Sequence, residues 1–60
     1  MANQGPFEIY RVSRSGESMR IAGGISSDQL AISEARREKA RQPSNSYQVK
    51  DRSGAVIFQA

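Results

Sequence analysis

Hydrophobic and polar residues alternate in the first segment of the chain. Residues 7–14, FEIYRVSR, alternate and are rich in β-branched and aromatic side chains, which is typical of a strand. Gly16 in SRSGES tolerates the positive φ of a tight turn, so residues 19–22 are expected to return as a second strand. The glycine pair that follows ends this strand or forms a bulge in it. This part of the chain predicts a β-hairpin.

The middle of the chain has the composition of a helix that continues to Gln42, because Pro43 cannot extend it. Three consecutive residues can cap its N-terminus: Ser26, Ser27 and Asp28. Gln29 stands three residues after the first of them, as in a capping box. On a helical wheel a narrow apolar stripe forms beside the stem of Lys39: Ala31, Ile32 and Ala35. Leu30 points elsewhere and is expected to pack at the helix entrance.

A second hairpin is predicted after the helix, with strands at residues 47–51 and 55–59 and a tight turn at DRSG. The order of elements is strand, strand, helix, strand, strand. It predicts an α+β fold, ββαββ, in which two hairpins form one four-stranded antiparallel sheet with the helix packed on one face. Residues 1–6 are expected to be a flexible N-terminal arm, and residues 7–60 a single domain.

Strand periodicity divides the side chains between the two faces of the predicted sheet. Eight are expected to face the helix: Phe7, Ile9, Met19, Ile21, Tyr47, Val49, Val56 and Phe58. The other face then presents nine: Glu8, Tyr10, Val12, Arg20, Ala22, Gln48, Lys50, Ile57 and Gln59. Four of these would form an apolar cluster rimmed by charge, which is the composition of a protein interface: Tyr10, Val12, Ala22 and Ile57.

The apolar cluster leaves three interpretations open. Scattered apolar residues on a small protein need no functional explanation. Alternatively, the protein forms a homodimer or binds another protein through this face or an edge strand. In the third interpretation single-stranded nucleic acid stacks on Tyr10, although one aromatic ring is a weak signal for such a site.

The sequence EARREKAR in the predicted helix raises the alternative of nucleic-acid binding. The residues that would make those contacts are Arg11, Arg20, Arg36, Arg37, Lys39 and Arg41. The basic residues of the predicted helix lie all around it. The acidic residues precede the basic ones along the helix, and this is the order that the helix dipole favours. Oppositely charged pairs at i,i+3, Glu34 with Arg37 and Glu38 with Arg41, take up part of the charge. The net charge of +3 is spread along the chain, so a solvated helix face is the favoured interpretation.

Little in the chain indicates chemistry. The 60 residues include no cysteine and no histidine, so we expect no catalytic residue, no metal site, no cofactor and no small-molecule substrate. We therefore expect a protein that is not an enzyme. No apolar run approaches the roughly 20 residues that span a membrane, and MANQGPFEIY lacks the features of a signal peptide. A cytoplasmic location is expected.

The stretch QLAISEARREKA, followed by SYQVKDRSGAVI, resembles a small bacterial ββαββ domain family of uncharacterised function. The matching positions are Ala31, Ile32, Ala35, Arg36, Asp51 and Gly54. The resemblance covers the C-terminal half only, since Met19 and Ile21 stand where the family usually has an aromatic residue in its second strand. It implies the fold and no activity. Together these observations predict a small protein-interaction module of bacterial or phage origin that self-associates.

Overall fold

The structure, a computed structural model, describes residues 5–60, so most of the arm expected over residues 1–6 lies outside the described residues. The elements follow the predicted order with small changes at their ends. They are β1 (Phe7–Val12), β2 (Ser18–Ile25), α1 (Asp28–Arg41), β3 (Ser46–Lys50) and β4 (Val56–Gln59). Gly16 and Gly54 have φ values of 94° and 87° in the two hairpin turns, which confirms their role there.

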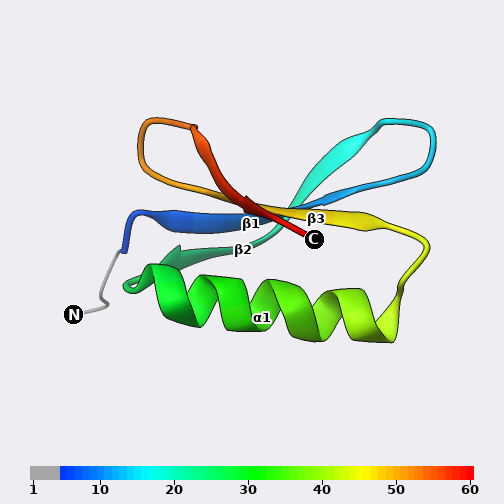
Figure 1. The fold of residues 1–60 in the computed structure, drawn as a ribbon. Coiled ribbons are helices and arrows are strands. Elements are labelled where there is room, and N and C mark those ends of the chain that lie inside the picture. The colour runs from blue at the N-terminus through cyan, green and yellow to red at the C-terminus, as the bar shows by residue number, and fades with distance from the viewer. Residues whose placement is uncertain (1–4) are drawn as a thin grey trace.

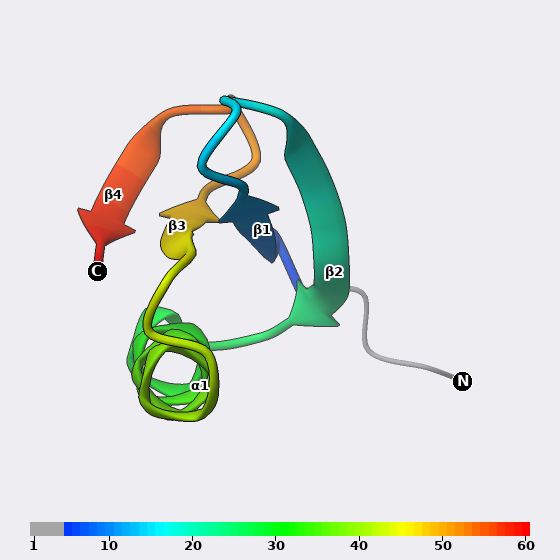
Figure 2. The same cartoon turned by 90° about the vertical axis from the view of Figure 1, so that its right-hand side faces the viewer.

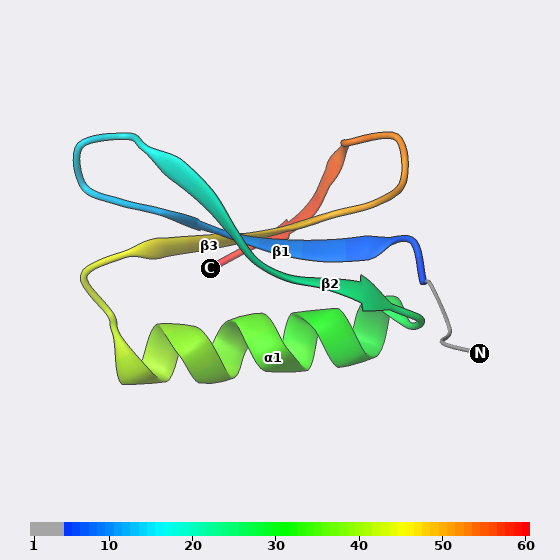
Figure 3. The ribbon, with the colours of Figure 1, turned by 180° about the vertical axis from the view of Figure 1, so that it is seen from behind.

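One antiparallel sheet contains all four strands in the order β2-β1-β3-β4 (Figure 1). The two hairpins therefore meet through β1 and β3, and β2 and β4 are the edge strands. Helix α1 lies along one face of the sheet, and the turns of both hairpins bend away from it (Figures 1 and 3). This arrangement confirms the predicted α+β fold of type ββαββ.

Helix α1 begins after Ser27, whose hydroxyl accepts hydrogen bonds from the amides of Gln29 and Leu30 at 3.1 and 3.4 Å. Ser27 is thus the N-cap, and the capping box expected from Ser26 does not form. Leu30 is 61% exposed, so the expectation that it packs at the helix entrance is wrong. The amide of Gln42 donates to the carbonyl of Glu38 at 2.9 Å and ends the helix.

A small core lies between α1 and the two central strands. Its five fully buried residues are Ile9, Ala31, Ala35, Tyr47 and Val49. Ala31 and Ala35 have short side chains, so the helix backbone lies close to the sheet. Partly buried residues surround this core: Phe7, Ile21, Ala22, Ile25, Ile32 and Phe58. With so few buried residues, a chain of this size has little apolar burial to offset its conformational entropy.

Register shifts change which side chains face the helix. Two shifts in the β1–β2 ladder place Ala22 opposite Ile9, on the core side. One shift in the β3–β4 ladder places Val56 opposite Lys50, on the far side from the helix. The faces expected for Ala22 and Val56 are therefore wrong, because one extra residue in a strand reverses the alternation beyond it. Met19 remains on the helix side but is 56% exposed and adds little to the core.

Candidate interaction surface

The open face, meaning the sheet face opposite α1, has a polar network at its centre. The Tyr10 hydroxyl donates to Glu8 Oε1 at 3.0 Å, and Arg20 Nη1 forms an ion pair with Glu8 Oε2 at 2.9 Å. Lys50 Nζ lies 4.3 Å from the centroid of the Tyr10 ring, a cation–π contact. The contacts link β2, β1 and β3. Both the hydroxyl and the ring of Tyr10 are therefore engaged within the chain.

Hydrogen bonding sets the protonation of this network. The hydrogen bond from Tyr10, followed by that from Arg20, holds the pKa of Glu8 below its usual value. The bond to the Glu8 carboxylate raises the pKa of Tyr10, because loss of the hydroxyl proton would place two negative charges side by side. Glu8 is therefore ionised and Tyr10 protonated at neutral pH.

The four residues expected to form an apolar cluster are not gathered on this face. Ala22 packs against the core instead. Tyr10 belongs to the polar network, and half-buried Val12 has serines opposite it on both neighbouring strands. Ile57 lies on β4, and β3 separates it from the other three. The open face is thus polar at its centre, and its exposed apolar side chains lie on β4.

The β4 edge, defined as residues Val56–Gln59 with their free backbone side, is an uncharged edge strand. Among residues 5–60 it pairs only with β3, and Figure 2 shows it at the outer side of the sheet with no other described segment beyond it. Val56 and Ile57 are 46% and 41% exposed. Edge strands are usually protected by charged residues, prolines, bulges or short length. This strand has neither charge nor proline, and only its four residues and one register shift limit pairing.

The bonds to β3 identify the free backbone groups of the β4 edge. Ala60 and Tyr47 exchange two backbone hydrogen bonds, of 3.1 and 2.8 Å. In an antiparallel ladder such bonded pairs alternate with pairs whose amides and carbonyls point outward. Phe58, opposite Val49, therefore also faces β3 with its backbone groups. Gln59, which lies between these two positions, directs its amide and carbonyl away from the sheet, where a further strand could bind them, and the register shift at Ile57 interrupts the alternation beyond Phe58.

The other edge strand, β2, is less suited to accept a strand. It contains two register shifts and the charged residue Arg20, both of which discourage edge pairing. The Arg20 side chain also lies close to the strand at Gly23, where an added Cβ atom would be 3.0 Å from Arg20 Nη1. Of the two edges, β4 is the more open.

Most of the basic residues considered for nucleic-acid contact already have partners in the chain. Arg20 and Arg41 form ion pairs with Glu8 and Glu38, at 2.9 and 3.2 Å, and these are the ion pairs found within residues 5–60. Arg11 contacts Met19 Sδ at 3.6 Å. Arg36 lies 5.3 Å from the centroid of the Phe58 ring, and Lys39 donates a hydrogen bond to the Asn45 carbonyl at 2.8 Å. Arg37 is exposed. These six residues come from β1, β2 and α1 and do not form one continuous surface.

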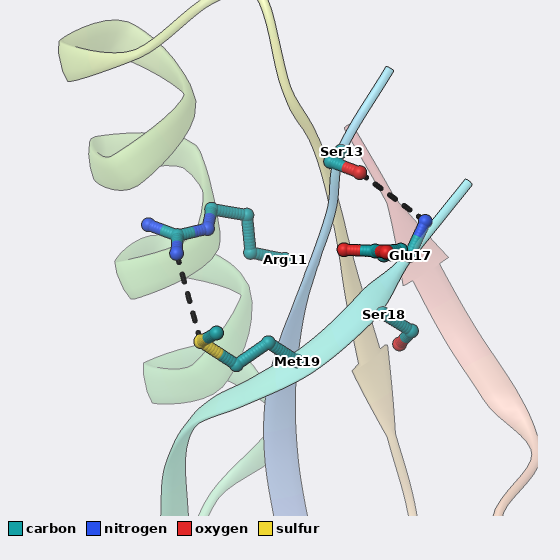
Figure 4. Close-up of a pocket in the computed structure, with 5 residues that line it drawn as sticks. All are labelled: Arg11, Ser13, Glu17, Ser18 and Met19. Atoms are coloured by element: carbon teal, nitrogen blue, oxygen red, sulfur yellow. Dashed lines mark hydrogen bonds between the residues drawn. The ribbon is translucent and has the colours of Figure 1, made fainter. Parts of the chain in front are cut away.

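A small hollow lies beside the β1–β2 hairpin. Its volume is about 140 Å³, and its lining residues are Arg11, Ser13, Glu17, Ser18 and Met19 (Figure 4). Pockets for drug-sized ligands usually have roughly 300–1,000 Å³. The Glu17 amide donates to the Ser13 hydroxyl at 3.2 Å, and Arg11 reaches toward the thioether of Met19, so the polar groups here mainly hold the hairpin together.

Comparison with family models, with curated proteins and with solved structures finds no match to this chain. In the part of the chain that the structure describes, no three metal-binding side chains come together. No helix within residues 5–60 is long and apolar enough to cross a membrane. The geometry of the sheet therefore provides the main basis for a functional proposal.

Sequence reasoning did not single out Val56 and Phe58 as part of a surface. Alternation alone predicts that both face the helix side of the sheet. The signal that could have indicated them is the segment from Ala55 to Phe58, the longest uninterrupted apolar run in the chain. An uncharged apolar run in a terminal strand indicates an edge that lacks the usual protection.

Proposed function

We propose that the protein is a non-catalytic interaction module that self-associates through its β4 edge. The observation that carries this proposal is an uncharged edge strand with outward-directed backbone groups and two exposed apolar side chains, Val56 and Ile57. Addition of a strand at such an edge is a common mode of protein recognition, because backbone hydrogen bonds supply affinity and side chains supply specificity.

A second copy is the partner that fits this edge best. Two β4 strands carry no charge between them, so an antiparallel pair brings no like charges together on the strands themselves. Association would also cover apolar side chains that the small core leaves exposed. The proposal includes the cytoplasmic location and the bacterial or phage origin expected from the sequence.

Nucleic-acid binding has less support as a function. The proposed contact residues are divided among three elements, and five of the six already have intramolecular partners. Tyr10 is not a free stacking platform, since Lys50 lies over its ring. A nucleic-acid site of this kind would require several of these contacts to be exchanged for phosphates.

Sedimentation equilibrium tests the self-association directly. At roughly tens of micromolar, where mass action favours association, we expect a mass of twice the 6.6 kDa of the chain. Ile57→Glu places a charge on the β4 edge and is expected to give a folded monomer. Ala40→Glu makes the same change in charge at an exposed helix position and is expected to remain a dimer. A wild-type monomer under these conditions, or equal behaviour of the two variants, contradicts the proposal.

A further inference from the structure

The turns of the two hairpins are built in the same way. In the first turn, the Ser13 amide donates to the Glu17 carbonyl at 2.8 Å, and the Ser13 hydroxyl accepts from the Glu17 amide at 3.2 Å. In the second turn, the Asp51 amide donates to the Ala55 carbonyl at 3.0 Å, and Asp51 Oδ1 accepts from the Ala55 amide at 3.1 Å. In both turns a glycine of positive φ donates its amide to the carbonyl of the first residue at 2.9 Å. The turns are therefore equivalent, and in both the first residue is followed by Arg-Ser-Gly.

A pseudo-twofold axis perpendicular to the sheet relates the two hairpins. The strand order β2-β1-β3-β4 places the hairpins side by side, with β1 and β3 antiparallel at the centre. Tyr10 faces Gln48 at the middle of this ladder. Three residues further along each strand, the chain reaches Ser13 in one turn and Asp51 in the other. The same symmetry thus relates the central strands and the turns.

One arginine lies in each turn at the equivalent position, Arg14 in the first and Arg52 in the second. Both are exposed, and neither forms an ion pair within residues 5–60. Both turns bend away from α1, toward the side of the open face (Figures 1 and 3). Each arginine is four residues from the axis along its strand, so their Cα atoms are roughly 25 Å apart at about 3.3 Å per residue.

The open face between the two turns is polar at its centre, which favours a charged partner over an apolar one. The Glu8 carboxylate pairs with Arg20 at 2.9 Å, and Lys50 lies over the ring of Tyr10. The Tyr10 ring is therefore not available for stacking with a base. A partner that binds here would be recognised by its charge.

Basic residues outnumber acidic ones on this side of the sheet. The charged residues of the open face and the two turns are Arg14, Arg20, Lys50, Arg52, Glu8, Glu17 and Asp51. Asp51 Oδ1 accepts three hydrogen bonds within its own turn. An arginine side chain is longer than that of glutamate or aspartate, so the two guanidinium groups can reach farther from the turns than these carboxylates. A polyanion complements this arrangement.

We propose that the two Arg-Ser-Gly turns, with the open face between them, bind the phosphate backbone of double-stranded DNA. The strands of a duplex are antiparallel, so local twofold axes relate the phosphates of one strand to those of the other, as in sites whose symmetry mirrors that of the bound protein. Arg14 and Arg52 would each contact one strand, since guanidinium groups bind phosphate oxygens well. The contacts are to phosphates and carry no base specificity. This inference goes beyond self-association, does not depend on the β4 edge and uses neither the helix nor Arg11.

Fluorescence anisotropy with a labelled duplex of about 20 base pairs, roughly two helical turns, tests the proposal. At low salt we expect Arg14→Gln and Arg52→Gln to weaken binding severalfold and by similar factors, because the two positions are equivalent. The double variant should lose the product of the two factors. Each removed phosphate contact should also reduce the slope of log affinity against log salt by about 1. Glu17→Gln removes a carboxylate from the first turn and should strengthen binding.

Arg37→Gln is the matched control, because it makes the same change in charge at an exposed position of α1, on the other side of the sheet. We expect it to change the affinity far less than either turn variant, with all variants shown to be folded by circular dichroism. Absence of binding at low salt, or an equal loss from Arg37→Gln, overturns the proposal. A single strand of the same length, or polyglutamate, that binds as tightly as the duplex overturns it as well, because neither has the twofold relation between its anionic groups.

Discussion

At the scale of single residues, Asp51 organises the turn that presents β4. Its Oδ1 accepts hydrogen bonds from the Ser53 hydroxyl at 2.6 Å, the Ser53 amide at 2.9 Å and the Ala55 amide at 3.1 Å. The Gly54 amide bonds to the Asp51 carbonyl at 2.9 Å, and Gly54 has the positive φ that closes the turn. Asp51 therefore controls the direction in which the chain enters the β4 edge.

The pH dependence of this turn follows from its hydrogen bonds. The bonds from the Ser53 hydroxyl and then the Ala55 amide hold the pKa of Asp51 below its usual value. A carboxyl whose pKa is lower in the folded state stabilises the fold above its unfolded pKa and loses that effect as pH falls through the folded pKa. We expect Asp51→Asn to lower the melting temperature at pH 7. The difference from wild type should shrink as pH falls below roughly 4, near the unfolded pKa.

Circular dichroism melts between pH 2.5 and 7 check this expectation. Glu17→Gln serves as the control, because it removes one carboxylate from the other hairpin turn, where its side chain is exposed. The Glu8 carboxylate also titrates, so only the difference between wild type and Asp51→Asn is informative. A difference that stays constant or grows toward acid pH contradicts the assigned role of the Asp51 charge.

At the scale of elements, local patterns predict the strands, the turns and the helix but not the register between strands. Gly16, Gly54 and the Pro43 stop each act within a few residues, so each can be recognised in the sequence. The shifts that turn Ala22 toward the core and Val56 away from it arise from pairing between strands. The Gly23-Gly24 pair signals a possible bulge, while no comparable residue marks the shift in the β3–β4 ladder. The apolar run from Ala55 to Phe58 indicates this strand in the sequence, but the face on which Val56 lies follows only from the ladder.

The contact between α1 and the sheet depends on small side chains. Ala31 and Ala35 are fully buried against the sheet, where residues such as Tyr47 and Val49 fill the remaining space. Ala35→Leu adds volume at a closed contact, and overpacking of this kind typically costs about 1–3 kcal/mol. For a domain of about 60 residues this corresponds to a lower melting temperature by several degrees or more. Urea denaturation followed by circular dichroism measures the loss.

Ala40 offers a matched comparison for this substitution. It lies on the same helix but is exposed, so Ala40→Leu makes the same chemical change without entering the core. We expect its free energy of unfolding to stay within about 0.5 kcal/mol of wild type, as is usual for surface substitutions. Equal destabilisation by the two leucines would mean that α1 does not pack on the sheet through Ala35.

At the scale of the whole molecule, the small core and the open sheet edge have one cause, which is the small number of apolar residues in the chain. The described chain extends about 35 × 20 × 19 Å and buries five residues completely. A chain of this size has too few apolar residues to cover both edges and both faces of a four-stranded sheet. Here the β2 edge carries charge and bulges, and the centre of the open face carries the Glu8 network. The β4 edge has the least protection, and the proposed association through it would add stability.

Net charge gives the self-association a dependence on salt that distinguishes it from nucleic-acid binding. Each copy has a net charge of +3, while the β4 edge itself is uncharged, so charge opposes the approach of two copies without contributing to the contact. The screening length falls from roughly 10 Å at 0.1 M salt to about 3 Å at 1 M. The dimer dissociation constant should therefore decrease between these concentrations, whereas complexes with nucleic acid weaken steeply as salt is added.

Sedimentation equilibrium at pH 7 measures this trend in the dissociation constant. The variant Ile57→Glu, expected to stay monomeric throughout, shows whether added salt merely causes nonspecific aggregation. A dissociation constant that rises with salt would indicate an interface formed by charge pairing, and the uncharged β4 edge would then not be the contact.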